Sequence, residues 1–73
     1  MQLIVDYEYD NEKLNIHEIN TIEIPIKSYI IFNDETYFSI MRLILDYESL
    51  HHGVFLLGYP KIKNIKIVHE NDE

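Results

Sequence analysis

The chain has 73 residues, 47% of them hydrophobic, and its 13 acidic and six basic side chains give a formal charge of −7. Abundant isoleucine and tyrosine exclude a disordered acidic tail, and the shortage of Lys and Arg argues against direct binding of nucleic acid. No apolar run approaches the ~20 residues of a membrane span, and without cysteine no disulfide can form. We expect one compact cytoplasmic domain over residues 1–73, with residues 70–73 as a frayed acidic tail.

The first predicted element is a strand over residues 2–9, because polar and apolar side chains alternate there. One parity is apolar or aromatic and the other is acidic: Leu3, Val5, Tyr7 and Tyr9 against Asp6, Glu8 and Asp10. Successive side chains of a strand point to opposite faces, so the three carboxylates would lie in file, roughly 6.6–6.8 Å apart. This spacing is comparable to that of the phosphates of a nucleic-acid strand, which such a row can imitate. A solvated sheet face, or a charged edge that blocks edge-to-edge pairing, is the simpler explanation and stays open.

A polar cluster at residues 10–13 predicts a hairpin turn, and a second extended stretch follows over residues 14–26. Because Pro25 cannot donate a ladder hydrogen bond, this strand should lie on an edge of the sheet or be interrupted there. Residues 29–32 resume the extended character and predict an optional third strand.

The clearest element is a helix over residues 34–52, which neither proline nor glycine interrupts. Asn33 is a good N-cap, and two acidic residues follow in the first turn, where negative charge favours the helix dipole. Two histidines occupy the last turn, and Gly53 ends the helix. Arg42 and Asp46 are four residues apart, which predicts a local ion pair.

The polar side chains of this helix form one narrow stripe: Glu35, Ser39, Arg42, Asp46 and Ser49. Nearly all its other residues are apolar or aromatic, a far wider surface than the ~100° stripe that a single sheet covers. Either the sheet wraps around the helix or a second copy of the chain covers it. For a homodimer, the expected interface consists of Tyr37, Met41, Leu43 and Tyr47.

After the helix, residues 54–57 form a short apolar run between two glycines and predict a buried strand. A turn follows, and residues 62–69 predict the closing strand. The lysines of this last segment should balance the acids by cross-strand pairing, or meet the acidic face of a second copy: Lys61, Lys63 and Lys66. The whole order, ββ(β)αββ, predicts an α+β fold in which a small antiparallel sheet of four to five strands packs on one central helix.

The sequence offers little for catalysis or for a cofactor. It lacks cysteine and a Gly-x-Ser-x-Gly motif, and its two glycines cannot build a phosphate-binding loop. Adjacent residues at a helix end point in different directions, so His51 and His52 should not share a metal ion, and favourable charge at the helix end explains both. A calcium loop starting at Asp6 is excluded, because Asn11 stands at the position that requires glycine and His17 at that of the bidentate glutamate. We therefore expect no enzyme, no cofactor and no metal site.

We expect a small acidic, non-enzymatic binding protein, an inhibitor or decoy that occupies a basic surface of another protein. Nucleic-acid mimics, phage counter-defence proteins and immunity proteins share this combination of small size and acidity. The residues assigned to partner binding are Asp6, Glu8, Asp10 and Glu12. The alternative is a homo-oligomeric structural or accessory domain whose acids only confer solubility. The lack of alanine and a single arginine suggest an AT-rich coding sequence, as in phages and low-GC bacteria.

Overall fold

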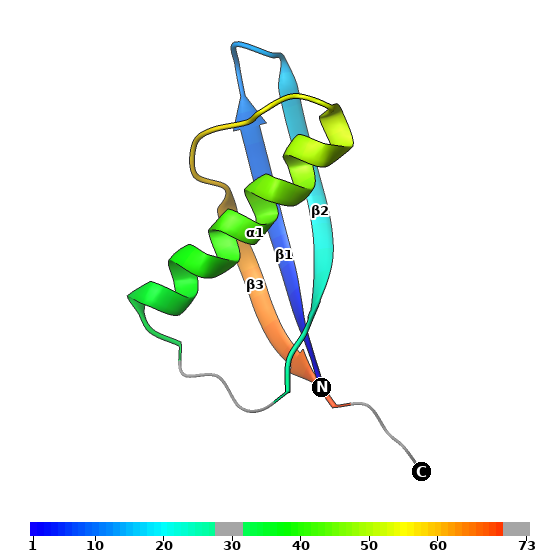
Figure 1. Ribbon diagram of the computed structural model, residues 1–73, viewed down its shortest axis with the longest axis vertical. Coiled ribbons are helices and arrows are strands. Elements are labelled where there is room, and N and C mark those ends of the chain that lie inside the picture. Colours follow the sequence, from blue (N-terminus) through cyan, green and yellow to red (C-terminus); the bar gives the residue numbers. More distant parts are fainter. Residues whose placement is uncertain (28–31, 70–73) are drawn as a thin grey trace.

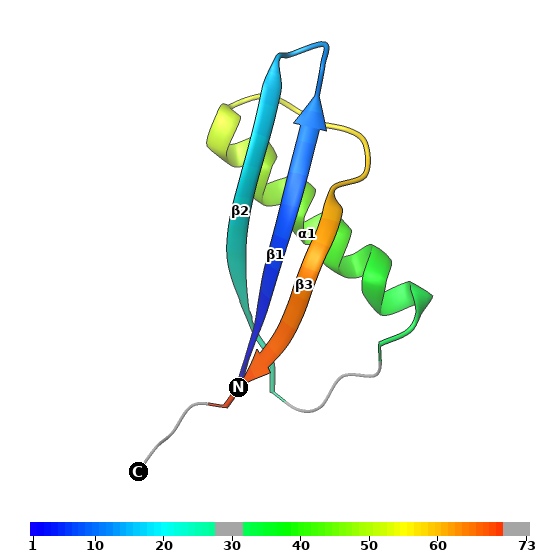
Figure 2. The same cartoon turned by 180° about the vertical axis from the view of Figure 1, so that it is seen from behind.

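The computed structural model describes residues 1–27 and 32–69 of the chain. They form three strands and one helix: β1 (Gln2–Asn11), β2 (Ile16–Pro25), α1 (Asp34–His52) and β3 (Lys61–Val68). The strands pair antiparallel in the order β2-β1-β3, and α1 lies diagonally across one face of the sheet (Figure 1). Seen from behind, the opposite face is not covered by any described element (Figure 2). The predicted α+β class is confirmed.

β1 occupies the centre of the sheet and supplies most of the core, in line with its alternation. Its inward side chains expose at most 1% of their surface: Leu3, Val5, Tyr7 and Tyr9. They pack with Ile40 and Ile44 of α1 and with Leu56. Because each fully buried apolar side chain contributes roughly 1.5–3 kcal/mol, the packing of β1 against α1 contributes substantially to stability.

A tight turn at residues 12–15 joins β1 to β2. Asn15 has a φ of 56°, a left-handed conformation that asparagine tolerates, and its N–H donates to the carbonyl of Glu12 at 3.2 Å. The turn lies two residues later than predicted, because the ladder between the strands continues to Asn11. β2 is an edge strand that ends at Pro25, as expected from the missing N–H of that residue.

β3 pairs with the other edge of β1 through an irregular register between Asp6 and Tyr7. This β-bulge gives β3 one extra residue, so Lys63 and Asn64 are both exposed. The isoleucines of β3 are partly buried against the core. The lysines of β3 are therefore directed away from α1.

α1 begins and ends where the capping signals predict. The side chain of Asn33 accepts a hydrogen bond from the N–H of Thr36 at 2.9 Å. Gly53 has a φ of 71°, which glycine adopts without steric cost, and its N–H donates to the carbonyl of Ser49 at 2.9 Å. The observed bounds agree with the predicted residues 34–52.

The sheet of the described residues has three strands, so the predicted four to five is too many. Residues 54–57 are not a strand, and only Leu56 in that run is buried. The N–H of Leu56 donates to Ser49 Oγ at 3.0 Å, and the carbonyl of Leu57 accepts from the Tyr9 hydroxyl at 2.7 Å. Because side chains satisfy these backbone groups, the segment closes over the core without a strand partner.

Two further expectations fall largely outside the described ranges. Of the optional strand at residues 29–32, residues 29–31 are not described, and Phe32 lies in no strand. The tail expected at residues 70–73 is also outside the described part. Within the ranges that are described, no helix combines the length and the apolarity that a membrane span requires.

Candidate functional site

The carboxylate row, defined as Asp6, Glu8 and Asp10, lies on the open face of the sheet. The residues between them point into the core, so the three carboxylates share one face. Asp6 and Glu8 are partly buried and Asp10 is exposed. Asp6 Oδ1 accepts a hydrogen bond from Thr21 Oγ1 at 2.6 Å. Glu12, the fourth residue assigned to partner binding, is exposed in the turn beyond the strand.

Basic side chains from both neighbouring strands flank the carboxylate row. Lys63 Nζ lies 3.7 Å from Glu8 Oε1, as the predicted cross-strand pairing requires. On the other side His17 pairs with Asp10, and its Nε2 lies 3.9 Å from Glu8 Oε2. β3 places two further lysines on the same face, Lys61 and Lys66. This face therefore presents a weaker negative field than a bare row of carboxylates.

A second arrangement, which the sequence reasoning missed, contains a buried carboxylate. Glu48 of α1 exposes 0% of its surface. Its Oε2 accepts hydrogen bonds from the Tyr7 hydroxyl and from Asn20 Nδ2, the latter at 3.0 Å. Its Oε1 lies 3.3 Å from Nε2 of His52, which in turn lies 2.9 Å from Glu18 Oε2. We call these five residues the polar cluster; it joins β1, β2 and the last turn of α1.

The sequence does contain a signal for the burial of Glu48. This residue follows Ile40 and Ile44 at intervals of four, and residues four apart lie on the same face of a helix. A carboxylate so placed is costly to bury unless hydrogen bonds compensate, and here two donors do so. Burial raises the pKa of Tyr7 above its ordinary range, and the hydrogen bond to Glu48 and the negative charge of that carboxylate raise it further. Tyr7 is thus held as a protonated donor.

Two groups of side chains in the described ranges could hold a metal ion. In the first, one ligand atom each from Glu18, His51 and His52 lies within 4.8 Å of the others. The imidazole rings of His51 and His52 meet edge to face, with centroids 5.1 Å apart. From the sequence we expected these two side chains to point in different directions, but their rings are in contact. The second group lies on the open face of the sheet, where its members already pair with one another: Glu8, Asp10 and His17.

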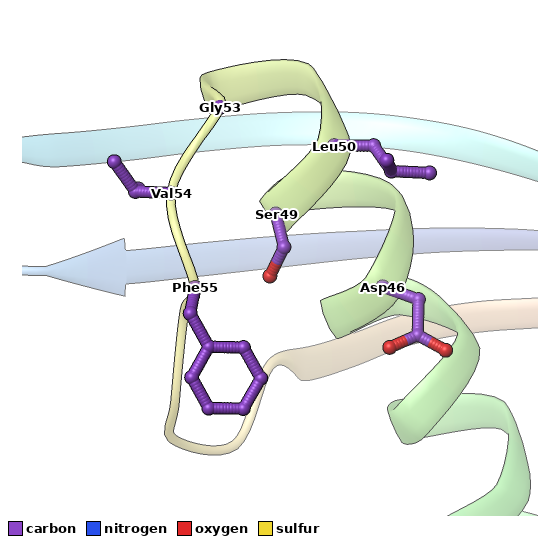
Figure 3. A pocket seen from close by; sticks show the side chains of 6 residues that line it. All are labelled: Asp46, Ser49, Leu50, Gly53, Val54 and Phe55. Carbon is purple, nitrogen blue, oxygen red and sulfur yellow. The ribbon is translucent and has the colours of Figure 1, made fainter.

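A hollow of about 640 Å³ opens at the C-terminal end of α1 (Figure 3). α1 and the loop that follows it both line this terminal hollow: Asp46, Ser49, Leu50, Gly53, Val54 and Phe55. Two of its apolar side chains are highly exposed: Leu50 exposes 85% of its surface and Phe55 exposes 82%. The expected pair of Asp46 with Arg42 is not among the ion pairs of the described residues, so this carboxylate has no charged partner there.

The residues assigned to a homodimer interface divide into two groups. Tyr37, Leu43 and Tyr47 expose 42–46% of their surface, and the sheet does not wrap around α1 to cover them. Met41 exposes only 8%, so it packs within the chain and offers little surface to a second copy. A second hollow of about 240 Å³, the edge hollow, lies between α1 and β2 and is lined by Ile22, Glu23, Ile24, Pro25, Leu43 and Tyr47.

Comparison with known proteins supplies no relative with a function that could be transferred to this chain. No family model matches it, and no curated protein or solved structure matches it at a significant level. Its function therefore has to be inferred from its own surfaces: the carboxylate row, the polar cluster and the two hollows.

Proposed function

We propose that this chain is a small non-enzymatic protein that binds a basic segment of another protein in the terminal hollow. The observation that carries the proposal is a group of exposed apolar side chains beside Asp46, whose carboxylate has no ion-pair partner within residues 1–27 and 32–69. Besides Leu50 and Phe55, Val54 in the lining of the hollow exposes 45% of its surface. Small soluble proteins seldom leave so many large apolar side chains of one region uncovered unless that region binds something.

The lining of the terminal hollow indicates the chemistry of the partner. A lysine or arginine side chain has an aliphatic stem and a cationic head. Leu50 and Phe55 offer apolar surface for the stem, and Asp46 offers a carboxylate for the head. The formal charge of −7 favours the approach of a basic protein over long distances. We infer an inhibitor or decoy that covers a basic surface of its partner.

The carboxylate row has a supporting part in this proposal. A partner that contacted Glu8 would have to compete with Lys63 and His17 for that carboxylate. Asp10 and Glu12 are more exposed and lie toward the hairpin end of the sheet. We therefore assign the row to attraction of the partner and the terminal hollow to contact with it.

Binding of a defined peptide tests the proposal. The probe is an unstructured peptide that alternates leucine and arginine, together with the same peptide carrying neutral citrulline in place of arginine. Added to the ¹⁵N-labelled chain, the arginine peptide should shift the backbone amides of residues 46–57. The Asp46→Asn variant should bind it up to about fivefold more weakly, because an ion pair at an exposed site contributes about 0.2–1 kcal/mol.

The matched control is Glu35→Gln, which removes the same charge from the first turn of the same helix. This variant should bind the arginine peptide with the same affinity as the parent chain. The citrulline peptide lacks the positive charge, so its affinity for the parent should be as low as the affinity of the arginine peptide for Asp46→Asn. Shifts confined to the carboxylate row would contradict the assignment of contact to the terminal hollow.

A homo-oligomeric domain remains the second candidate, and the edge hollow is the observation that favours it. Leu43 and Tyr47 are half-exposed beside β2, whose outer edge has no strand partner among the described residues. A second copy that pairs with this edge would cover both side chains. Light scattering at increasing concentration should then show a dimer that the Leu43→Glu variant cannot form. A parent chain that stays monomeric at high concentration would remove this candidate.

A further inference from the structure

The polar cluster and the neighbouring His51 together offer a set of ligand atoms that no part of the proposed binding function uses. Glu18 projects from β2, whereas His51 and His52 come from the last turn of α1. Their ligand atoms lie within 4.8 Å of one another. Around a tetrahedral zinc ion with bonds of about 2.0–2.1 Å, neighbouring ligand atoms are about 3.4 Å apart. No two of these ligand atoms therefore have to approach by more than about 1.4 Å (4.8 minus 3.4 Å) to share one ion.

A second observation indicates that the same place favours positive charge. Glu48 Oε1 is buried and accepts no hydrogen bond from the described residues; Nε2 of His52 lies 3.3 Å from it and faces Glu18 Oε2 at 2.9 Å. In the described ranges, the ion pairs of Glu18 and Glu48 are formed with His52 and not with lysine or arginine. Two carboxylates thus converge on one imidazole. A bound cation would supply the positive charge that two carboxylates in a partly buried site require.

From these observations we propose that Glu18, His51 and His52 bind a divalent transition-metal ion of the Zn²⁺ type. Two imidazoles and one carboxylate are a ligand set that zinc takes in proteins, with a fourth position left for water. The carbonyl end of α1 lies beside the site, and the dipole of a helix favours positive charge at that end.

The surrounding side chains suit this assignment. Glu48 is fully buried, and its Oε1 lies 3.3 Å from the same ring nitrogen of His52 that faces Glu18, so this carboxylate adds negative charge beside the proposed ion. The ring of His51 stacks on that of Tyr47, with centroids 6.2 Å apart and an angle of 7° between the planes. Bound metal would tie β2 to the end of α1 and so stabilise the fold.

The test is a titration of the full chain, freed of metal by a chelator, with Zn²⁺ alone. Calorimetry should show one ion per chain, and the thermal unfolding temperature should rise with the Zn²⁺ concentration. In long-range ¹H–¹⁵N spectra of the histidine rings, the nitrogens of His51 and His52 should shift on addition of Zn²⁺ and those of His17 should not.

The decisive variant is His51→Ala, because His51 is exposed and its removal should leave the fold intact. It should weaken Zn²⁺ binding by at least about tenfold, as loss of a ligand or of its supporting partner does in metal sites. His17→Ala is the matched control, since it removes a histidine from the other acidic group. Absence of Zn²⁺ binding, binding that His51→Ala leaves unchanged, or binding that His17→Ala abolishes would each overturn the assignment.

Discussion

Replacing Tyr7 by phenylalanine tests whether the polar cluster stabilises the contact between the sheet and the helix. Tyr7 exposes 0% of its surface, and its hydroxyl donates to the buried carboxylate of Glu48. The substitution leaves Asn20 as the other donor to that oxygen. Because hydrogen bonds to charged groups contribute about 1.5–3 kcal/mol, we expect the free energy of unfolding to fall by that amount. In a domain of this size, each kcal/mol lost from the free energy of unfolding lowers the melting temperature by roughly 4–8 °C.

The loss in Tyr7→Phe should also depend on pH. The pKa of Tyr7 is raised in the folded chain, whereas in the unfolded chain it has its ordinary value of about 10. Below about pH 10 both states keep the proton, so the stabilisation is present in full. Above that pH the unfolded chain loses the proton before the folded chain does, so the free energy of unfolding of the parent falls as the pH rises. The Tyr7→Phe variant has no hydroxyl proton to lose at this position. The difference in free energy of unfolding between the parent and the variant should therefore become smaller as the pH rises above about 10.

Urea unfolding followed by far-ultraviolet circular dichroism at pH 8 and pH 11 measures both effects. Tyr59→Phe is the matched control, because Tyr59 exposes 82% of its surface. This control should change the free energy of unfolding by less than about 0.5 kcal/mol. The reasoning is refuted if Tyr7→Phe unfolds at the same urea concentration as the parent at pH 8, or if its deficit is equal at the two pH values.

Three further substitutions probe the core, the cap of α1 and the terminal hollow. Ile44→Ala removes a fully buried side chain and should cost about 2–5 kcal/mol in urea unfolding; an unchanged midpoint would contradict the packing of α1 on β1. Asn33→Ala deletes the cap acceptor for Thr36 and should cost about 0.5–2 kcal/mol, seen as a lower melting temperature, and no change would mean that the cap does not stabilise α1. Leu50→Ser should leave stability within about 0.5 kcal/mol of the parent while weakening binding of the arginine peptide, and undiminished binding would argue against the hollow.

The position of the carboxylate row shows why charge counted along the chain is a weak guide to a charged surface. The alternation around Glu8 correctly predicts that the acids share a face. The neighbours of Glu8 depend on strand order, and this order brings Lys63 from one edge strand and His17 from the other. A central strand is flanked on both sides, so its charges are screened by groups that lie far away in the sequence. The same carboxylates on an edge strand would have had one such neighbour fewer.

The unequal success of the sequence-based predictions has a similar cause. The bounds of α1 follow from Asn33 and Gly53, which act on backbone groups within one turn of the helix. The short apolar run at residues 54–57 was wrongly predicted to be a strand, because hydrophobicity alone does not show whether a ladder partner is within reach. Its backbone is instead satisfied by side chains of Ser49 and Tyr9, which only the closed fold brings near.

By itself, the sequence determined the helix, the three strands of the described sheet and the inward face of the central strand, since capping and alternation are relations between close neighbours in the chain. Only the tertiary structure decided which charged groups meet. The diagonal crossing of α1 over the sheet carries Glu48 and His52 to Glu18, and the pairing of β3 with β1 sets lysines beside the carboxylate row. Such encounters depend on the strand order and on the helix crossing, which no short stretch of sequence records.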